Sequence, residues 1–335
     1  MDLVTLKDNE EAFNRYKIRP RILVNVDNID ISGEIFGSRT ALPLGFSPAA
    51  MHRLAHPDGE LATSRAAAKF GLCMGLSSYA TESMENVAAQ GLGNPYVMQL
   101  CVLRDRQTTL QIVQRAEGER TTPLIRSGDG YDDIRTLTRV NNFFTRIAAG
   151  YKAIFLSVDT PLLGRRLNEY RNNFTLPEDM EWPNLLSDGK SELSGSENNA
   201  ETPGKHDFDP SLDWDTAISW LRAHTKLQLW IKGVYTEDDV VLAIRHGLDG
   251  IIVSNHGGRQ LDGVPATLDA LRECAVAAAG KIPIAVDGGI RRGTDIFKAL
   301  AMGACHCFVG RIPIWGLAVC FNQIKPYFKT HVIRY

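Results

Sequence analysis

Eight short apolar runs, several of them rich in β-branched residues, recur along this chain with helical patterns between them. Each run has the length of one buried strand. The runs span residues 42–46, 72–77, 95–100, 153–158, 227–232, 249–254, 282–287 and 305–309. The helical patterns span residues 58–70, 82–90, 104–117, 236–246, 265–279 and 293–302. Strands that alternate with helices predict the α/β class, here a single (β/α)8 TIM barrel.

Nearly every predicted strand ends in a polar or glycine-rich tip. The tips are Ser47-Pro48-Ala49-Ala50, Ser77-Ser78, Gln99, Ser157-Val158-Asp159, Lys232-Gly233, Ser254-Asn255-His256, Asp287-Gly288-Gly289 and Gly310-Arg311. Barrel enzymes place their chemistry at the carboxyl ends of the strands, so the tips predict one shared pocket. A doubly wound sheet is the alternative, but the glycine fingerprint of a dinucleotide-binding turn is absent after the first strand.

Composition limits the number of domains, the kinds of partner and the location of the protein. The 335 residues are 44 % hydrophobic, which allows one barrel or two smaller domains. A net charge of -2 gives no reason to expect nucleic acid or an anionic membrane as a partner. Met1–Glu10 has no features of a secretory leader, and no apolar run is long enough to span a bilayer. We therefore expect an intracellular protein without a membrane anchor.

The six cysteines follow no disulfide-framework spacing, so reduced thiols are expected. Cys305-His306-Cys307 has the residue types of a metal site. In a strand, however, His306 points away from both sulfurs, because successive side chains alternate between faces. We therefore interpret this tripeptide as barrel packing and expect no metal.

The polar loop after the run 249–254 carries the chain's best catalytic candidates. His256 is a candidate general base, since an imidazole titrates near neutral pH. Arg259, three residues later, can hold a carboxylate in bidentate fashion. The alternative is a hydrogen-bonded loop histidine beside a surface arginine.

Glycines and cations gather after the last two predicted strands. Asp287-Gly288-Gly289-Ile290-Arg291 and Gly310-Arg311 lie where barrels commonly bind phosphate on backbone N–H groups. The alternative is a pair of tight turns that begin helices. Taken together, the two turns favour a phosphate-bearing ligand.

The stretch Ser254-Asn255-His256-Gly257-Gly258-Arg259-Gln260-Leu261-Asp262 resembles the active-site motif of the FMN-dependent α-hydroxy-acid oxidase and dehydrogenase family, which includes glycolate oxidase and lactate oxidase. The resemblance runs from about Ala12 to about Ala318. It implies FMN as cofactor and oxidation of an L-2-hydroxy acid, a small-molecule carboxylic acid, to a 2-oxo acid. It also implies O2 or another electron acceptor, a homotetramer, and a cytoplasmic or peroxisomal location.

The resemblance assigns the cofactor contacts to the strand tips. Lys232, otherwise a surface lysine, is placed beside flavin N1 and C2=O, where a cation stabilises the reduced ring. Other residues are expected along the flavin, namely Ala49, Ala50, Ser77, Gln99, Ser157 and Ser254. The ribityl and phosphate are expected at Asp287, Gly289, Arg291, Gly310 and Arg311.

The segment Asp159-Thr160-Pro161 matches the family segment whose aspartate orients the catalytic histidine. A carboxylate on one imidazole nitrogen fixes the tautomer and stabilises the imidazolium. Arg166 matches an arginine that reaches the substrate carboxylate. The alternative for Asp159 is a simple turn before proline.

Two substrate contacts of the family are changed in this chain. Cys101 stands where the family usually has a tyrosine that contacts the substrate, and Tyr16 lies too close to Arg19-Pro20-Arg21 to supply the family's other tyrosine. Cysteine is smaller and a weak donor, which leaves room for a bulkier substrate. One alternative is therefore a tailoring oxidase that dehydrogenates a biosynthetic carboxylic acid. A second alternative, an inactive flavin-binding relative, is favoured by the insertion and the shortened end described next.

Three segments depart from a barrel of about residues 41–318. Residues 118–148 form an insertion where connections are normally about 2–6 residues long. We hypothesise that it is an unspliced intron in the gene model, which sequencing the transcript tests. Residues 182–206 are expected to form a mobile loop over the barrel mouth, because they are rich in polar residues and glycine. The final helix is expected to be truncated.

Overall fold

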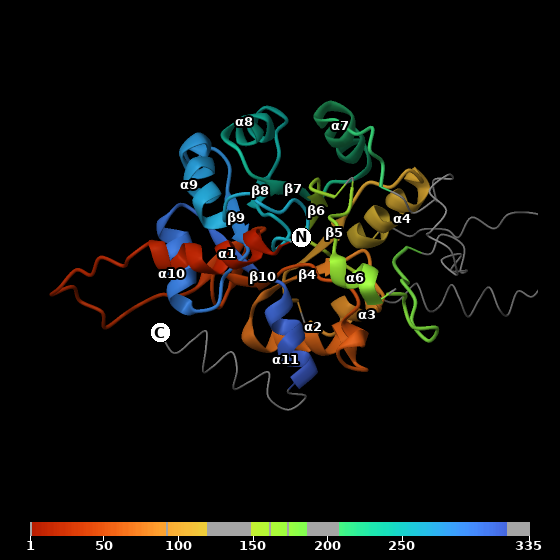
Figure 1. Cartoon of the computed structure of the whole chain (residues 1–335), viewed down its shortest axis with the longest axis horizontal. Coiled ribbons are helices and arrows are strands. Elements are labelled where there is room, and N and C mark those ends of the chain that lie inside the picture. The colour runs from red at the N-terminus through yellow and green to blue at the C-terminus, as the bar shows by residue number, and fades with distance from the viewer. Residues whose placement is uncertain are drawn as a thin grey trace, which may run out of the picture.

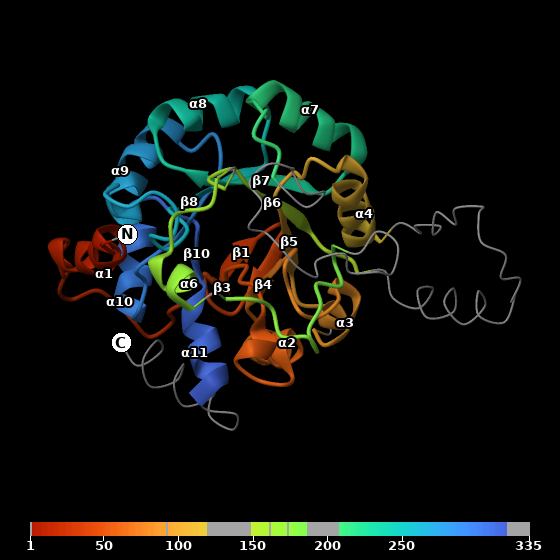
Figure 2. The same cartoon turned by 45° about the vertical axis from the view of Figure 1, so that its right-hand side comes forward.

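A closed barrel of parallel strands forms the centre of the computed structural model, which describes residues 2–91, 93–118, 149–160, 162–172, 174–185 and 208–319 (Figures 1 and 2). The strand order is β10, β3, β4, β5, β6, β7, β8 and β9. The strands are Leu44–Phe46 (β3), Cys73–Ser77 (β4), Tyr96–Leu100 (β5), Ala153–Ser157 (β6), Gln228–Val234 (β7), Gly250–Val253 (β8), Ile284–Asp287 (β9) and His306–Val309 (β10). The predicted TIM barrel is confirmed, and all eight strands lie within two residues of their predicted ends.

The six predicted helices are also present and surround the barrel. They are Gly59–Phe70 (α2), Met84–Ala89 (α3), Arg106–Glu117 (α4), Glu237–Arg245 (α8), Thr267–Ala278 (α9) and Gly293–Ala301 (α10). Local caps explain several of their starts: Asp105, Ser83 and Thr236 accept hydrogen bonds from first-turn N–H groups of α4, α3 and α8. None of the helices in the described ranges could span a membrane.

Further helices were not predicted from the sequence. They are Val4–Arg15 (α1), the 3-10 helix His52–Leu54 (η1), Leu167–Asn172 (α6) and Trp214–His224 (α7). A further helix, Arg311–Val319 (α11), lies where the truncated final helix was expected. The inward stripe of α1 is Thr5, Asn9, Ala12 and Phe13, so half of it is polar. A helix with such a stripe lacks the apolar periodicity that a sequence search detects.

Aromatic side chains fill the barrel interior. Phe36, between β1 (Gly33–Ile35) and β2 (Ser38–Thr40), packs edge-on against Phe155 and Trp230 at ring-centroid distances of 5.7 and 5.2 Å. The β1–β2 hairpin leads directly into β3, so it closes the amino-terminal end of the barrel. The carboxyl-terminal end of the barrel is left for the polar strand tips.

His306 lies within β10, as the alternation argument predicted. It is fully buried, and both ring nitrogens lack a hydrogen-bond partner among the described residues. Burial lowers the pKa of its imidazole to about 3. Its neighbour Cys305 is exposed, and no cluster of metal-ligating side chains occurs in the described ranges. The insertion 119–148, most of the loop 182–206 and the residues after Val319 lie outside the description.

Candidate active site

Side chains from neighbouring strand tips are joined by hydrogen bonds at the carboxyl end of the barrel. Gln99 Nε2 on β5 donates to Ser157 Oγ on β6 at 3.2 Å. Ser254, directly after β8, donates through Oγ to Asp287 on β9 at 2.6 Å, and Ser47, directly after β3, donates to the same carboxylate at 3.1 Å. Five of the strand tips predicted to form one pocket are therefore linked directly to another tip, although Ser47 after β3 reaches Asp287 past the intervening β10.

Lys232 places a buried positive charge in this cluster. Only 3 % of the residue is exposed, and its Nζ lies 2.7 Å from Ser254 Oγ and 3.2 Å from Asp287 Oδ2. Burial alone would lower the pKa of the ammonium, but the Asp287 and Asp159 carboxylates outweigh that effect and raise it. Lys232 is therefore a fixed cation in the barrel mouth and not a surface lysine.

His256 and Asp159 form a pair across the mouth. His256 Nδ1 lies 3.2 and 3.3 Å from the two carboxylate oxygens of Asp159, so its Nδ1–H donates to them and Nε2 is the basic nitrogen. Gly233 permits this approach, since a Cβ on it would lie 2.8 Å from the Asp159 Cβ. Among the described residues, His256 Nε2 has no hydrogen-bond partner.

The surroundings tune both members of the pair. Burial lowers the pKa of His256 below 6.5; the Asp159 hydrogen bond opposes this effect, and the Lys232 charge adds to it. Burial would raise the pKa of Asp159, but the hydrogen bond from His256 and the Lys232 charge lower it overall. The imidazole is therefore neutral, and the carboxylate ionised, at neutral pH.

The loop that carries His256 has an unusual backbone. His256 itself has φ 55°, and Gly257 and Gly258 continue with φ 65° and 72°. A residue with a side chain rarely adopts this left-handed conformation, and such positions concentrate at functional sites. The two glycines explain how the chain turns sharply enough to present the imidazole to the mouth.

Both predicted arginines lie near this loop. Arg166 Nη2 donates to Gln260 Oε1 at 3.2 Å, and Gln260 Nε2 in turn donates to the Asp159 carbonyl at 2.7 Å. Arg259 is half-buried, and its charge contributes to the low pKa of His256. Gln260 was missed by sequence reasoning as a site residue, although it lies inside the quoted motif.

Cys101 follows β5 and points into the same polar cluster. It is 7 % exposed, and its Sγ lies 3.0 Å from Thr160 Oγ1 and 3.5 Å from Gln99 Nε2. Burial raises the pKa of the thiol to about 11, so it stays protonated. Tyr16 is far from this cluster, since its hydroxyl donates to Asp269 on α9.

The turns after β9 and β10 fit a phosphate. A Cβ on Gly310 would come no closer than 3.8 Å to the Ser47 Cβ, and Gly310 does not have a positive φ, so the protein itself does not require glycine there. Within the described chain, no hydrogen bond engages the backbone N–H of Gly289 or Gly310. Arg311 Nη2 donates to the Gly257 carbonyl at 2.8 Å, and Arg291 pairs with Glu10. The open backbone and nearby cations suit an anionic group.

The remaining flavin candidates also lie at this end of the barrel. Ser77 ends β4 and is buried, while Ala49 and Ala50 follow β3 and are half-buried. The structure thus brings the predicted residues together around one mouth. Their hydrogen-bond donors are hydroxyls, an amide, a buried ammonium and glycine N–H groups. Such donors suit the polar edge and the phosphate of a flavin mononucleotide.

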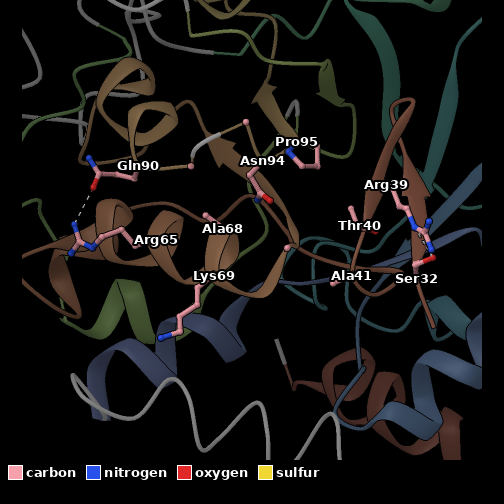
Figure 3. Close-up of a pocket in the computed structure, with 13 residues that line it drawn as sticks. Ser32, Arg39, Thr40, Ala41, Arg65, Ala68, Lys69, Gln90, Asn94 and Pro95 are labelled. Carbon is pink, nitrogen blue, oxygen red and sulfur yellow. Dashed lines mark hydrogen bonds between the residues drawn. The ribbon is translucent and has the colours of Figure 1, made fainter. Parts of the chain in front are cut away.

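A cavity of about 780 Å³ lies at the opposite end of the barrel (Figure 3). Its walls include Ala41, Gly71 and Pro95, which come just before β3, β4 and β5. Its cations are partly neutralised, because Arg39 pairs with Asp30 at 3.0 Å and Arg65 pairs with Asp58. Barrel enzymes do not place their chemistry at this end, so the cavity is not the candidate site.

A parallel barrel with a histidine–aspartate pair, a buried lysine and glycine-containing turns after its last strands fits the class of flavin-dependent oxidoreductases. The family model described as FMN-dependent dehydrogenase matches residues 1–132 and 133–322. This chain therefore belongs to the FMN-dependent α-hydroxy-acid oxidase and dehydrogenase family. Its cofactor is FMN, and the match begins at residue 1, ahead of the expected start near Ala12.

Named relatives agree with this assignment. Oxidase FUB9 of Gibberella moniliformis is 45 % identical over 320 residues, which cover 95 % of this chain and 74 % of the relative. 2-Hydroxyacid oxidase 1 of Homo sapiens is 43 % identical over 321 residues, covering 95 % and 78 %. A solved mandelate oxidase variant with (S)-mandelic acid superposes with a TM-score of 0.75 at 35 % identity, covering 95 % and 79 %.

Proposed function

We propose that this chain oxidises an L-2-hydroxy acid to the corresponding 2-oxo acid. The observation that carries the proposal is the His256–Asp159 pair, which leaves His256 Nε2 neutral, basic and without a hydrogen-bond partner among the described residues. Arg166 and Arg259 lie within the same loop cluster and supply cations for a substrate carboxylate. The similarity to 2-hydroxyacid oxidase 1 supports this substrate class.

In this mechanism the residues of the chain bind, orient and move a proton. The two guanidiniums hold the substrate carboxylate, and His256 Nε2 accepts a proton from the substrate. The Asp159 carboxylate then stabilises the imidazolium through Nδ1–H. Bound FMN would supply the chemistry that the side chains lack, because it would accept the two electrons and the second proton that leave the substrate.

We propose that the strand tips hold the cofactor. Gly289, Arg291, Gly310 and Arg311 would bind the phosphate, Asp287 the ribityl chain, and Lys232 the electron-rich edge of the ring. The remaining contacts are proposed for the residues that line the mouth, namely Ala49, Ala50, Ser77, Gln99, Ser157 and Ser254. The support for these roles is the two hydrogen-bonded groups of strand tips, Gln99 with Ser157 and Ser254 with Asp287, and the open backbone at Gly310.

We propose O2 as the electron acceptor, since several similar proteins are named oxidases. We further propose a homotetramer that acts in the cytoplasm or the peroxisome. An aliphatic segment supports self-association: Ile22, Leu23, Val26, Ile29 and Ile31 are 58–101 % exposed in the stretch between α1 and β1, which projects from the barrel (Figures 1 and 2). Light scattering tests the assembly, and cell fractionation tests the location.

A second candidate function is the dehydrogenation of a bulkier biosynthetic carboxylic acid. The observation that favours it is Cys101, a buried thiol in place of the family's larger tyrosine. A panel of acids of increasing side-chain size separates the two functions. Turnover highest with glycolate or lactate supports the first candidate, and turnover confined to bulky acids supports the second.

The experiment that tests the proposed function is a visible spectrum followed by anaerobic addition of L-2-hydroxy acids. We expect a flavin spectrum that bleaches with at least one acid. The matched variant His256→Asn should keep the flavin spectrum but bleach on the order of 100-fold more slowly or worse. A flavin-bound protein that no acid bleaches would support the inactive flavin-binding alternative instead.

A further inference from the structure

The amino-terminal helix α1 lies against the loop that carries His256 (Figures 1 and 2). Asn9 of α1 and Asn255 are 246 residues apart along the chain, yet their side chains are hydrogen-bonded. Asn255 directly precedes His256. We propose that α1 is a positioning element of the active site and that Asn9 is a positioning residue for His256. The inference rests on the proposed role of His256 as base.

Asn9 and Asn255 form a reciprocal amide pair. Asn9 Nδ2 donates to Asn255 Oδ1 at 2.9 Å, and Asn255 Nδ2 donates to Asn9 Oδ1 at 2.8 Å. Asn9 is 1 % exposed and Asn255 is 6 % exposed. Buried amides held from both sides have little freedom. Without Asn9, the Asn255 amide would lose two hydrogen bonds and keep those to the Tyr235 hydroxyl and the Gly258 N–H.

The pair also holds the backbone that follows His256. Asn255 Oδ1 accepts from the Gly258 N–H at 3.0 Å, and Asn9 Oδ1 accepts from the Thr267 N–H at 3.2 Å at the start of α9. The left-handed turn at His256 therefore lies between Asn255, whose side chain Asn9 holds, and Gly258, whose N–H that same side chain binds. Loss of Asn9 removes two of the hydrogen bonds that orient Asn255 in this turn.

Asp262, the last residue of the active-site motif 254–262, binds the same helix. The residue before α1, Leu3, provides no side-chain cap, and the Asp262 carboxylate instead accepts from the N–H groups of Leu3 and Thr5, both at 2.9 Å. Thr5 Oγ1 in turn accepts from the Gly263 N–H at 2.9 Å. Asn255 and Asp262 thus dock α1 at the two ends of the catalytic loop.

α1 also reaches the turn proposed for phosphate. A Cβ on Gly289 would collide with the Asn9 carbonyl oxygen at 1.8 Å, and Glu10 pairs with Arg291. The other end of α1 has separate anchors, since Lys298 Nζ donates to the Phe13 carbonyl at 2.7 Å and Tyr16 bonds Asp269. These anchors should keep α1 docked when the side chain of Asn9 is shortened.

The test compares Asn9→Ala with Lys298→Met, which removes an α1 anchor remote from the loop. For FMN-bound Asn9→Ala we expect kcat to fall on the order of 10- to 100-fold, because small displacements of a catalytic group cost this much. We also expect faster amide exchange in peptides that cover residues 254–266, with FMN content unchanged. Lys298→Met should change thermal stability without either effect.

A double-mutant cycle gives the second measurement. If Asn9 acts through Asn255, the Asn9→Ala change should lower kcat much less in an Asn255→Ala background than in the unchanged chain. Full kcat and unchanged exchange in Asn9→Ala, or strictly multiplicative effects on kcat in the cycle, would overturn the inference. A fully active His256→Asn variant would instead overturn the proposed function.

Discussion

Replacement of Lys232 by methionine tests whether the buried ion pair at the barrel mouth is as important as its geometry indicates. The Lys232 and Asp287 side chains are 4 % and 9 % exposed, and their charged atoms lie 3.2 Å apart. At an effective dielectric constant of about 20, charges at this distance attract by about 5 kcal/mol. Without the ammonium, Asp287 keeps the hydroxyls of Ser47 and Ser254 as its hydrogen-bond donors within the described ranges. We therefore expect the free energy of unfolding to fall by about 3–5 kcal/mol.

Urea unfolding of the FMN-free protein measures this loss without a contribution from cofactor binding. The matched control is Arg39→Met, because Arg39 and Asp30 form an ion pair that is 76 % and 69 % exposed. The control should leave the urea midpoint almost unchanged. The double variant Lys232→Met with Asp287→Leu should recover part of the loss, since no buried charge then remains unpaired. A loss below about 1 kcal/mol in Lys232→Met would refute the reasoning.

Three further predictions concern the base, the phosphate turn and the substrate contact. Because the pKa of His256 is lowered, kcat/KM should rise with pH through an inflection below 6.5 and then level off. The reason is that only the neutral imidazole accepts a proton. A pH–rate profile with its inflection above 7 would contradict this. Gly310→Ala should weaken FMN binding about tenfold, or about 1.4 kcal/mol, in a fluorescence titration. The urea midpoint of the FMN-free protein should stay the same. Unchanged FMN affinity would argue against phosphate binding at this turn. Cys101→Tyr should lower KM for glycolate about fivefold, because the tyrosine adds one hydrogen bond, and should raise KM for bulky acids in steady-state assays. An unchanged ratio of the two KM values would show that this position does not select substrate size.

Much of the fold could be predicted because its signals are local. Each barrel strand is a short apolar run that needs no distant partner to be recognised, and Ile251–Val253 is buried throughout as expected. The strand tips were predictable for the same reason, since all barrel strands point the same way and their polar ends must meet. The family resemblance added FMN and the proposed roles of Lys232 and Asp159, which composition and periodicity do not specify.

The sequence by itself determined the strands, most of the surrounding helices and the residues that gather at the mouth. Only the tertiary structure decided how the catalytic loop is held. Thr5 and Asn9 are polar, so from the sequence alone they look unsuited to the buried face of a helix. Their hydrogen-bonding partners lie in a loop about 250 residues away along the chain. Asn255 and Asp262 likewise gain their roles from α1. Such contacts depend on which polar groups the closed barrel brings within about 3 Å of each other, and a linear pattern carries no record of that distance.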